Sequence, residues 1–320
     1  MLGAMLASLI AMTLHAPAPA AGKLETVRVA VFPTPSNWGL YVGQSEGFFK
    51  SAGLDVQLLS IPNAPNTMQA LLTGAIEIAN VEPFPVFTAV VKHGPIASII
   101  AGDVNLAPYA VVTPKDITSA SQLKGKVIGG TVVTAYRLRE YLKRAGGLGY
   151  HDYNFLAAGA SGQRLQALEA GQVQAVLLDQ PAEYVAQEQG FHTLGYVSDV
   201  VPAVGVVLFT STHWATANAG TLVAFLKAFH RSIKWLYDPA NRQAAVDMLV
   251  PAINTTPALA ARTYDLLVTR LRVFSEDGTI PDQNLQTIID LMSAQGDLPV
   301  PPPKAAQFTD FRYNSRAKQR

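Results

Sequence analysis

The 320-residue sequence contains no cysteine. This absence excludes disulfide bonds, thiolate metal sites, cysteine nucleophiles and a lipid-modified N-terminal cysteine. The charges nearly balance, with 24 basic and 23 acidic residues, so the strongly basic surface typical of nucleic-acid-binding proteins is also missing. The six histidines show no metal-ligand spacing, and no HExxH, GxSxG or P-loop motif occurs. We therefore expect a protein with no cofactor, no metal site and no nucleic-acid partner.

No hydrophobic run is long enough to cross a bilayer, which takes about 20 apolar residues. The apolar stretch from Leu2 to Leu14 is followed by small residues and prolines, with Ala18 and Ala20 at the spacing of a cleavage site. We predict that residues 1–20 are a signal peptide, although no Lys or Arg precedes the apolar run. The alternative is an N-terminus that is frayed or holds the chain at a membrane. A soluble, exported chain without cysteine indicates the bacterial periplasm.

Strand-like runs alternate with stretches of helical periodicity along most of the chain. The first part predicts strands at 27–32, 54–59 and 76–81, and helices at 39–52, at 67–73 and from about Pro85. The second part predicts strands at 126–130, 153–158 and 173–178, with helices at 134–147, 162–171 and 181–190. Further helices are expected after residue 215 and at 240–250, 256–271 and 282–294, and the proline run at 299–303 is expected to end ordered packing. Alternation of this kind is typical of parallel sheets covered by helices.

An internal repeat relates the two parts of the chain. Residues 69–83, QALLTGAIEIANVEP, align without gaps with residues 166–180, QALEAGQVQAVLLDQ. Glu82 then falls opposite Asp179, each just beyond the end of a predicted strand. One interpretation is that all helix-Gly-strand units look alike, and the other is a pair of similar α/β lobes. Extended, proline-containing segments at 105–117 and 198–210 favour two lobes, with residues 21–108 and 205–320 in the first and 109–204 in the second.

Ligands of open parallel sheets bind beyond the carboxyl ends of the strands, next to helix N-termini. The loops predicted at those positions are rich in Gly, Ser, Thr and Asn, residues that bind ligands but also form ordinary turns. From these loops and the linkers we select the candidate ligand-binding residues Ser36, Asn37, Trp38, Asn66, Glu82, Tyr109, Thr131, Thr134, Ser161, Arg164 and Asp179.

Three kinds of side chain in this set suggest different ligand chemistry. Trp38 can stack on a ligand or pack over the edge of the first lobe, with Ser36 or Asn37 capping the following helix. The guanidinium of Arg164 can clamp an anion or lie on the surface. Glu82 and Asp179 can accept hydrogen bonds from an amine or cap helices. The sequence alone leaves these alternatives open.

Several motifs resemble the SsuA/THI5-like group of periplasmic solute-binding proteins. They are GLYVGQSEGFFKSAGLDVQLL, QALLTGAIEIA, GKVIGG, RLQALEAGQVQAVLLDQP and GTIPDQNLQTIIDLMSAQGDL, which together span about residues 27–300. The chain departs from the family pattern at Glu77 and Gln174, where the family usually has Asp.

The resemblance implies a type II periplasmic-binding fold, in which two α/β lobes are joined by a two-strand hinge and close on a ligand in the cleft between them. It implies a monomeric binding component that delivers its solute to an ABC permease and ATPase in the inner membrane. Among the family's ligands we favour a sulfonate, taurine or nitrate-like anion, with a thiamine-pyrimidine-like or aromatic ligand as the alternative. Enzymes of the THI5 and desulfinase types use cysteine, which this chain lacks.

Overall fold

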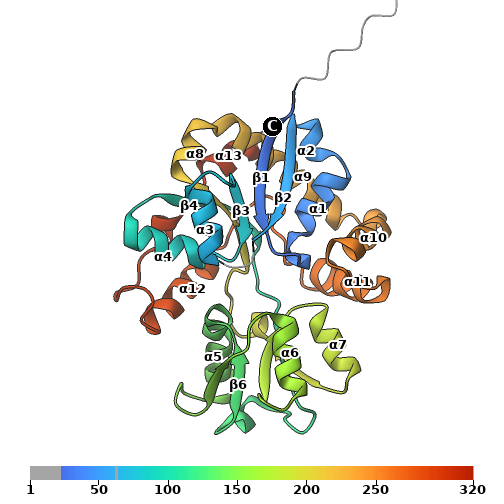
Figure 1. The fold of residues 1–320 in the computed structure, drawn as a ribbon, viewed down its shortest axis with the longest axis vertical. Coiled ribbons are helices and arrows are strands. Elements are labelled where there is room, and N and C mark those ends of the chain that lie inside the picture. Colours follow the sequence, from blue (N-terminus) through green and yellow to red (C-terminus); the bar gives the residue numbers. More distant parts are fainter. Residues whose placement is uncertain (1–22, 62–63, 320) are drawn as a thin grey trace, which may run out of the picture.

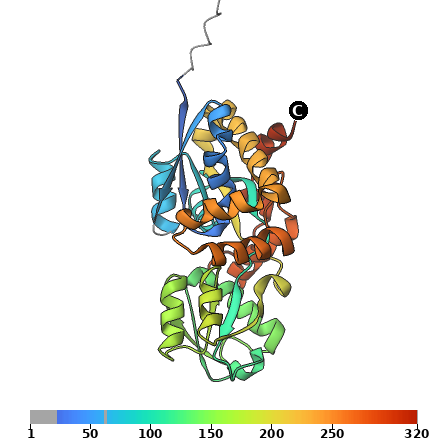
Figure 2. The same ribbon diagram turned by 90° about the vertical axis from the view of Figure 1, so that its right-hand side faces the viewer.

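The computed structural model describes residues 23–61 and 64–319, so the predicted signal peptide lies outside the described residues. Figure 1 shows an upper and a lower lobe joined by a narrow waist, and Figure 2 shows the same division from the side. Each lobe is built on one five-stranded sheet. This is the two-lobed α/β architecture that the internal repeat and the family resemblance predicted.

The sheet of the upper lobe, lobe 1, has the strand order β2-β1-β3-β10-β4. Its strands β1, β2 and β3 run parallel, whereas β10 is antiparallel to both of its neighbours. The strands are β1 Glu25–Val31, β2 Leu54–Ser60, β3 Ile78–Val81, β4 Ala97–Val104 and β10 Val206–Ser211.

The sheet of the lower lobe, lobe 2, repeats this plan in the order β7-β6-β8-β5-β9. Here β5 takes the place of β10 and is antiparallel to both β8 and β9. The strands are β5 Ala110–Thr113, β6 Val127–Gly130, β7 Asn154–Ala157, β8 Ala175–Leu178 and β9 His192–Tyr196. The interpretation of the repeat as two similar lobes therefore holds at the level of strand order.

Each segment that crosses between the lobes becomes the antiparallel strand of the lobe it enters. The two crossings lie side by side, since the Ala107 amide donates to the Ala203 carbonyl (3.2 Å) and the Gly205 amide to the Val104 carbonyl (2.8 Å). The predicted parallel strands are present in both sheets, but the alternation of strands and helices did not indicate the antiparallel strands. The linkers were predicted only as extended connections, yet their apolar residues complete the buried sheets.

Helices cover both sheets, and those that follow β10 belong to lobe 1 (Figure 1). The helix predicted over 39–52 is divided in two, because Gly47 takes a left-handed φ of 67°. The helices are α1 Trp38–Ser45, α2 Phe48–Ser51, α3 Ala64–Leu72, α4 Phe84–His93, α5 Val132–Gly146, α6 Ser161–Glu169, α7 Ala182–Glu188, α8 Thr212–Ala217, α9 Ala219–Tyr237, α10 Arg242–Ala252, α11 Pro257–Tyr264, α12 Asp282–Ala294 and α13 Arg312–Lys318.

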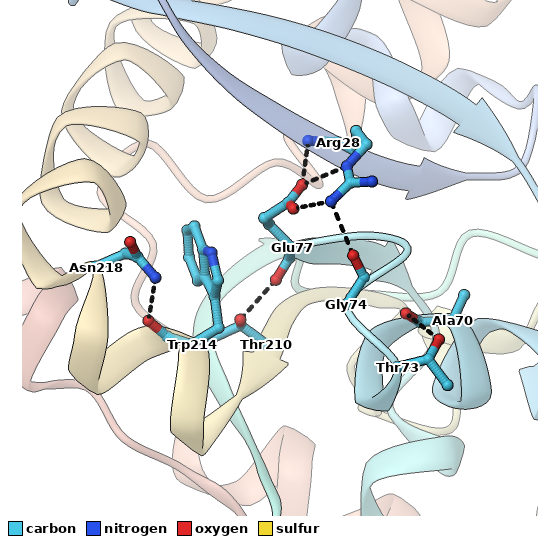
Figure 3. Close-up of polar contacts among 8 residues, drawn as sticks. All are labelled: Arg28, Ala70, Thr73, Gly74, Glu77, Thr210, Trp214 and Asn218. Carbon is cyan, nitrogen blue, oxygen red and sulfur yellow. Dashed lines mark hydrogen bonds and ion pairs between the residues drawn. The ribbon is translucent and has the colours of Figure 1, made fainter.

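The repeat extends to a hydrogen bond at the start of each third strand. In lobe 1, Glu77 accepts the backbone amide of Arg28 (2.6 Å) and also pairs with the Arg28 guanidinium, as Figure 3 shows. In lobe 2, the side chain of Gln174 accepts the backbone amide of Val127 (3.0 Å) in the same way. Both Glu and Gln can therefore accept a backbone hydrogen bond from the neighbouring strand at this position, where the family pattern has Asp.

The chain does not stop packing at the proline run, contrary to the prediction. Phe308 is fully buried in lobe 1, and its ring meets that of Phe87 edge-on at 4.9 Å. The Asp310 amide then donates to the Ile99 carbonyl of β4 (2.8 Å), and α13 packs on α9. The chain after the prolines is therefore fixed to the core by Phe308 and by Tyr313 of α13, which is also buried.

Replacing Gly43 by Ala should destabilise the protein by about 1–3 kcal/mol, as overpacking of a core does. A Cβ on Gly43 would collide with the Phe49 ring, which is stacked on Phe225 at 5.2 Å and has no room to move. Gly220→Ala in α9 is the matched control, because a Cβ there meets nothing within 4 Å. Urea unfolding should show a loss for the first variant only, and equal stabilities would contradict this packing.

Candidate functional site

The two lobes meet through a buried ion pair. Arg137 of α5 in lobe 2 donates from Nη1 to Oε1 of Glu82, which directly follows β3 in lobe 1 (2.9 Å). The same carboxylate oxygen accepts the hydroxyl of Tyr109 from the first crossing segment (3.1 Å). Arg137 also donates to the Val204 carbonyl of the second crossing segment (2.8 Å). One carboxylate and one guanidinium thus tie together both lobes and both crossings.

The Arg137 side chain has no solvent exposure, and Glu82 retains 20%. Aromatic rings replace water around the guanidinium, since its Cζ lies 5.3 Å from the Phe84 ring centre and 5.7 Å from that of Tyr109. The sequence analysis missed Arg137. It lies within the helix predicted at 134–147, and helical periodicity does not identify an arginine that is buried by the opposite lobe.

Further contacts join the lobes on both sides of this pair. On one side, the Tyr136 hydroxyl donates to Asp297 (2.6 Å) and Arg139 donates to Gln295 (2.9 Å), both just beyond α12. On the other side, the Tyr184 hydroxyl donates to the Arg262 carbonyl of α11 (3.2 Å). The lobes are therefore in contact on both flanks of the ion pair in this structure.

Tyr109 is the centre of a group of charges from both lobes. Burial raises the pKa of its phenol, and so do the carboxylates of Glu82 and Asp179, while Arg137 and Arg164 act in the opposite direction. Glu82 and Arg137 contact the tyrosine directly, and the charges of Asp179 and Arg164 lie near enough to act on its phenol. We call this cluster of Glu82, Tyr109, Arg137, Arg164 and Asp179 the interlobe junction. Four of its members were among the predicted site residues.

Asp179 has the position in lobe 2 that Glu82 has in lobe 1, directly after the third strand of its sheet. Its backbone carbonyl accepts the Glu183 amide of α7 (3.0 Å). Within the described part of the chain, its carboxylate makes no hydrogen bond or ion pair, and the residue is only partly buried. It is therefore the acid of the junction that remains free to accept a hydrogen bond from a ligand.

Arg164 does not point out as a clamp for an anion. It is 4% exposed and donates to three groups of its own lobe: the Leu177 carbonyl (2.6 Å), the Gly159 carbonyl (2.8 Å) and the Ser161 hydroxyl (2.5 Å). The prediction failed because Arg164 folds back under its own helix and fixes the loop before α6.

Trp38 belongs to the core and not to a ligand surface. The indole is completely buried, its Nε1 donates to the Ala245 carbonyl of α10 (3.1 Å), and its ring meets Tyr264 edge-on at 5.7 Å. Of the two alternatives left by the sequence, packing within lobe 1 is correct. Trp38, the first residue of α1, thus contacts α10 and α11, which lie about two hundred residues later in the sequence.

Asn37 directly precedes α1, but its side chain does not cap the helix. Its amide instead donates to the Phe32 carbonyl (2.6 Å) and accepts from Asn80 of β3 (2.9 Å). Asn80 also donates to Asp103 of β4 (2.7 Å), which is fully buried. Ser36 lies half-buried in the short 3-10 turn before α1. The capping prediction was wrong because the Asn37 amide joins three neighbouring segments of lobe 1.

The remaining candidates lie at helix starts. Thr131 and Thr134 cap α5 reciprocally, since each hydroxyl accepts the backbone amide of the other residue (2.7 and 3.1 Å). Ser161 opens α6 and is held by Arg164. Asn66 was predicted to cap the next helix, but α3 begins two residues earlier, at Ala64, which places Asn66 inside its first turn.

Neither a metal site nor a membrane span is found in the part of the chain that the structure describes. No three His, Asp or Glu side chains of residues 23–61 and 64–319 lie close enough to hold a metal ion. None of the helices within these ranges is long and apolar enough to cross a bilayer.

Comparison with known proteins places this geometry in a family. A sequence model described as NMT1/THI5 like matches residues 34–242. The chain belongs to the NMT1/THI5-like family. One relative of this NMT1/THI5-like chain is the formylaminopyrimidine-binding protein of Halalkalibacterium halodurans. The two sequences are 26% identical over 239 residues, which cover 71% of this chain and 70% of the relative.

Solved structures show the same fold. The alkanesulfonate-binding protein SsuA of Xanthomonas axonopodis pv. citri, bound to MOPS, has a TM-score of 0.71, with 20% identity over 90% of this chain and 99% of its own. The periplasmic nitrate-binding protein NrtA of Synechocystis PCC 6803 has a TM-score of 0.72, with 15% identity over 93% and 89% of the two chains. The NMT1/THI5-like chain therefore has the periplasmic-binding-protein fold, and the relatives named here are binding proteins.

Replacing Glu82 by Gln should destabilise the protein and loosen the contact between the lobes. Removal of one partner leaves the Arg137 charge buried without compensation, which costs up to about 3 kcal/mol, the lower end of the range for a buried pair, because Glu82 is 20% exposed. Urea unfolding and small-angle scattering should report a lower stability and a larger radius of gyration. Glu46→Gln, at an exposed position of lobe 1, is the control, and identical behaviour of the two variants would contradict the role of the pair.

The buried Asp103 should make stability depend on pH. Burial raises its pKa from 3.8 to about 8, against the opposing effect of the Asn80 hydrogen bond. The folded chain thus keeps a proton that the unfolded chain releases, so the stabilisation is complete below about pH 4 and is lost as the pH rises through about 8. Asp103→Asn should flatten the melting temperature between pH 5 and 8 relative to the exposed control Asp116→Asn. Parallel pH curves for the two variants would show that Asp103 does not carry this proton.

Proposed function

We propose that this chain is the periplasmic solute-binding component of an ABC importer and that it binds its solute at the interlobe junction. Membership of the NMT1/THI5-like family and the fold of named binding proteins support this function. The predicted signal peptide supports export. The proposal includes the lobe boundaries 21–108 with 205–320 and 109–204, a monomeric state, and delivery to a permease and ATPase after closure of the hinge.

The chemistry of the junction favours a ligand that donates hydrogen bonds. Asp179 offers a carboxylate with no partner among the described residues, and Glu82 uses only Oε1 in its contacts with Tyr109 and Arg137. Amines and amidines donate to such carboxylates, and the resulting charge-assisted bonds are roughly twice as strong as neutral ones. The observation that carries the proposal is that the Asp179 carboxylate in the junction has no partner among the described residues.

The same geometry disfavours the anionic ligand that the sequence led us to prefer. Arg137 donates to Glu82 and Val204, and Arg164 donates only to groups of lobe 2. The amides of Thr131 and Thr134 at the start of α5 already donate to the two threonine hydroxyls. With its cations engaged and an acid free, the junction suits an amino-substituted heterocycle better than a sulfonate. The ring of Tyr109 replaces Trp38 as the aromatic surface, and the formylaminopyrimidine-binding relative is consistent with this class.

We also propose that the chain is a binding protein and not an enzyme. The family enzymes to which the sequence was compared depend on cysteine, and this chain has none. Both cations of the junction are held by structural partners, with Arg137 bonded to the second crossing and Arg164 to its own lobe. Binding followed by closure needs no further reactive group.

A thermal-shift panel tests the ligand class directly. The protein is refolded from denaturant to remove any carried ligand and is then mixed with aminopyrimidines, taurine, alkanesulfonates, nitrate or aromatic carboxylates. A ligand at a hundred times its dissociation constant should stabilise the fold by about 2.7 kcal/mol. We expect aminopyrimidines to do so, whereas stabilisation by alkanesulfonates or nitrate alone would refute the donor-rich ligand.

Asp179→Asn should weaken binding of the stabilising aminopyrimidine by about 10- to 100-fold, because a hydrogen bond to a charged group contributes roughly 1.5–3 kcal/mol. The variant should fold normally, since the Asp179 carboxylate has no partner among the described residues. Glu169→Gln, an exposed acid at the end of α6 in the same lobe, is the matched control and should leave the affinity unchanged. Titration calorimetry measures both, and an unaltered affinity for Asp179→Asn would place the ligand elsewhere.

A further inference from the structure

A polar pocket lies on the outer face of lobe 1, between α9 and α13. It has a volume of about 420 Å³ and is lined by Lys227, His230, Arg231, Lys234, Asp277, Ala317 and Lys318. Figure 2 shows α13, in dark red beside the C-terminus, at the end of the molecule remote from lobe 2. The pocket is therefore separate from the interlobe junction, and the proposed function does not use it.

Positive charge is concentrated in this pocket. Four of its lining residues are cations and one is a carboxylate, whereas the whole chain has a net charge of only +1. Helix α9 contains no Asp or Glu, and its Lys227, Arg231 and Lys234 are spaced to lie along one face. Like charges three and four residues apart destabilise a helix. None of these three cations forms an ion pair within the described part of the chain, so nothing there offsets the repulsion.

Two of the cations are held in place. The guanidinium of Arg231 lies 4.1 Å from the centre of the Phe48 ring, which fixes its plane while its N–H groups make no hydrogen bond to the described residues. Lys318 Nζ is fixed by Asp277 (2.8 Å) and by the Thr279 hydroxyl (2.6 Å). Positions that are fixed before binding lower the entropy cost of holding a ligand.

A buried imidazole adds a polar group that is not satisfied by the protein. His230 lines the pocket and is only 6% exposed, and its Nε2 makes no hydrogen bond of good geometry within the described residues, although the Asn314 side chain lies close enough to act on its pKa. Burial lowers the pKa of His230 to about 4, so the ring is neutral at physiological pH. A buried polar atom without a partner is costly, and a bound ligand would lower that cost.

We propose that the pocket between α9 and α13 binds a phosphate group. Several cations around one cavity exceed what a single carboxylate neutralises, whereas a phosphate monoester carries nearly two charges and three acceptor oxygens. Arginine and lysine are the side chains that bind phosphate in proteins, the first through its planar fork and the second as a point charge. The volume leaves room for an organic group attached to the phosphate. The phosphate belongs either to a soluble metabolite or to a lipid headgroup.

The test compares two charge-matched triple variants. Lys227→Gln/Arg231→Gln/Lys234→Gln removes the three exposed cations of α9, and Lys92→Gln/Lys115→Gln/Lys126→Gln removes three exposed cations elsewhere. Binding is measured at constant ionic strength in two arms. Inorganic phosphate and glycerol 3-phosphate are titrated in the first arm. In the second, the protein is sedimented with vesicles of phosphatidylglycerol and phosphatidylcholine.

We expect saturable binding in at least one arm, weakened at least tenfold in the α9 variant and kept in the control variant. Binding of the soluble phosphates identifies a metabolite as the source, and binding of the vesicles alone identifies a lipid. The melting temperature of the α9 variant should be equal to or higher than that of the parent chain, since repulsion is removed. No saturable binding in either arm, or equal loss in both variants, overturns the proposal. Neither result depends on the ligand of the interlobe junction.

Discussion

The ion pair between Glu82 and Arg137 is the constraint on which the relation of the two lobes depends. A guanidinium with no solvent exposure requires a carboxylate partner, and Arg137 finds it in Glu82, which directly follows β3 in lobe 1. The contacts of Arg137 with Val204 and of Glu82 with Tyr109 then bring both crossing segments to the same point. The junction in this way combines the hinge, the lobe contact and the proposed binding site.

Most of the fold could be predicted from the sequence, because strand-helix units are encoded locally. The helix ends predicted at 52 and 73 are each one residue from the observed ends, Ser51 and Leu72, and Glu82 and Asp179 each directly follow a strand, as the repeat predicted. The sequence analysis missed β4 and β9, and it missed that both linkers supply antiparallel strands. Whether a buried strand is parallel or antiparallel depends on the strand it pairs with. The short sequence patterns of the linkers do not predict that partner.

The site was predicted less well, and the reasons are physical. The position of an acid after a strand follows from topology alone, so Glu82 and Asp179 were found. The direction of a long side chain follows from what packs against it: Trp38 turns toward Ala245, and Arg164 turns toward Leu177. Arg137 was not found because it is buried only when the second lobe meets the first. The positions of Trp38, Arg164 and Arg137 are the reason why we now expect a ligand bound by carboxylates and not one bound by cationic side chains.

The distance between the lobes in solution is the most direct test of an acid-based site that closes on its ligand. Because the chain has no cysteine, Lys50→Cys on α2 and Glu169→Cys on α6 allow one fluorophore on each lobe without background labelling. Single-molecule energy transfer would then be recorded with and without an aminopyrimidine, and with an alkanesulfonate for comparison. We predict that the aminopyrimidine shifts the population to a single, shorter distance and that the sulfonate leaves it unchanged. A shift with the sulfonate alone, or with neither compound, would contradict an acid-based site that closes on its ligand.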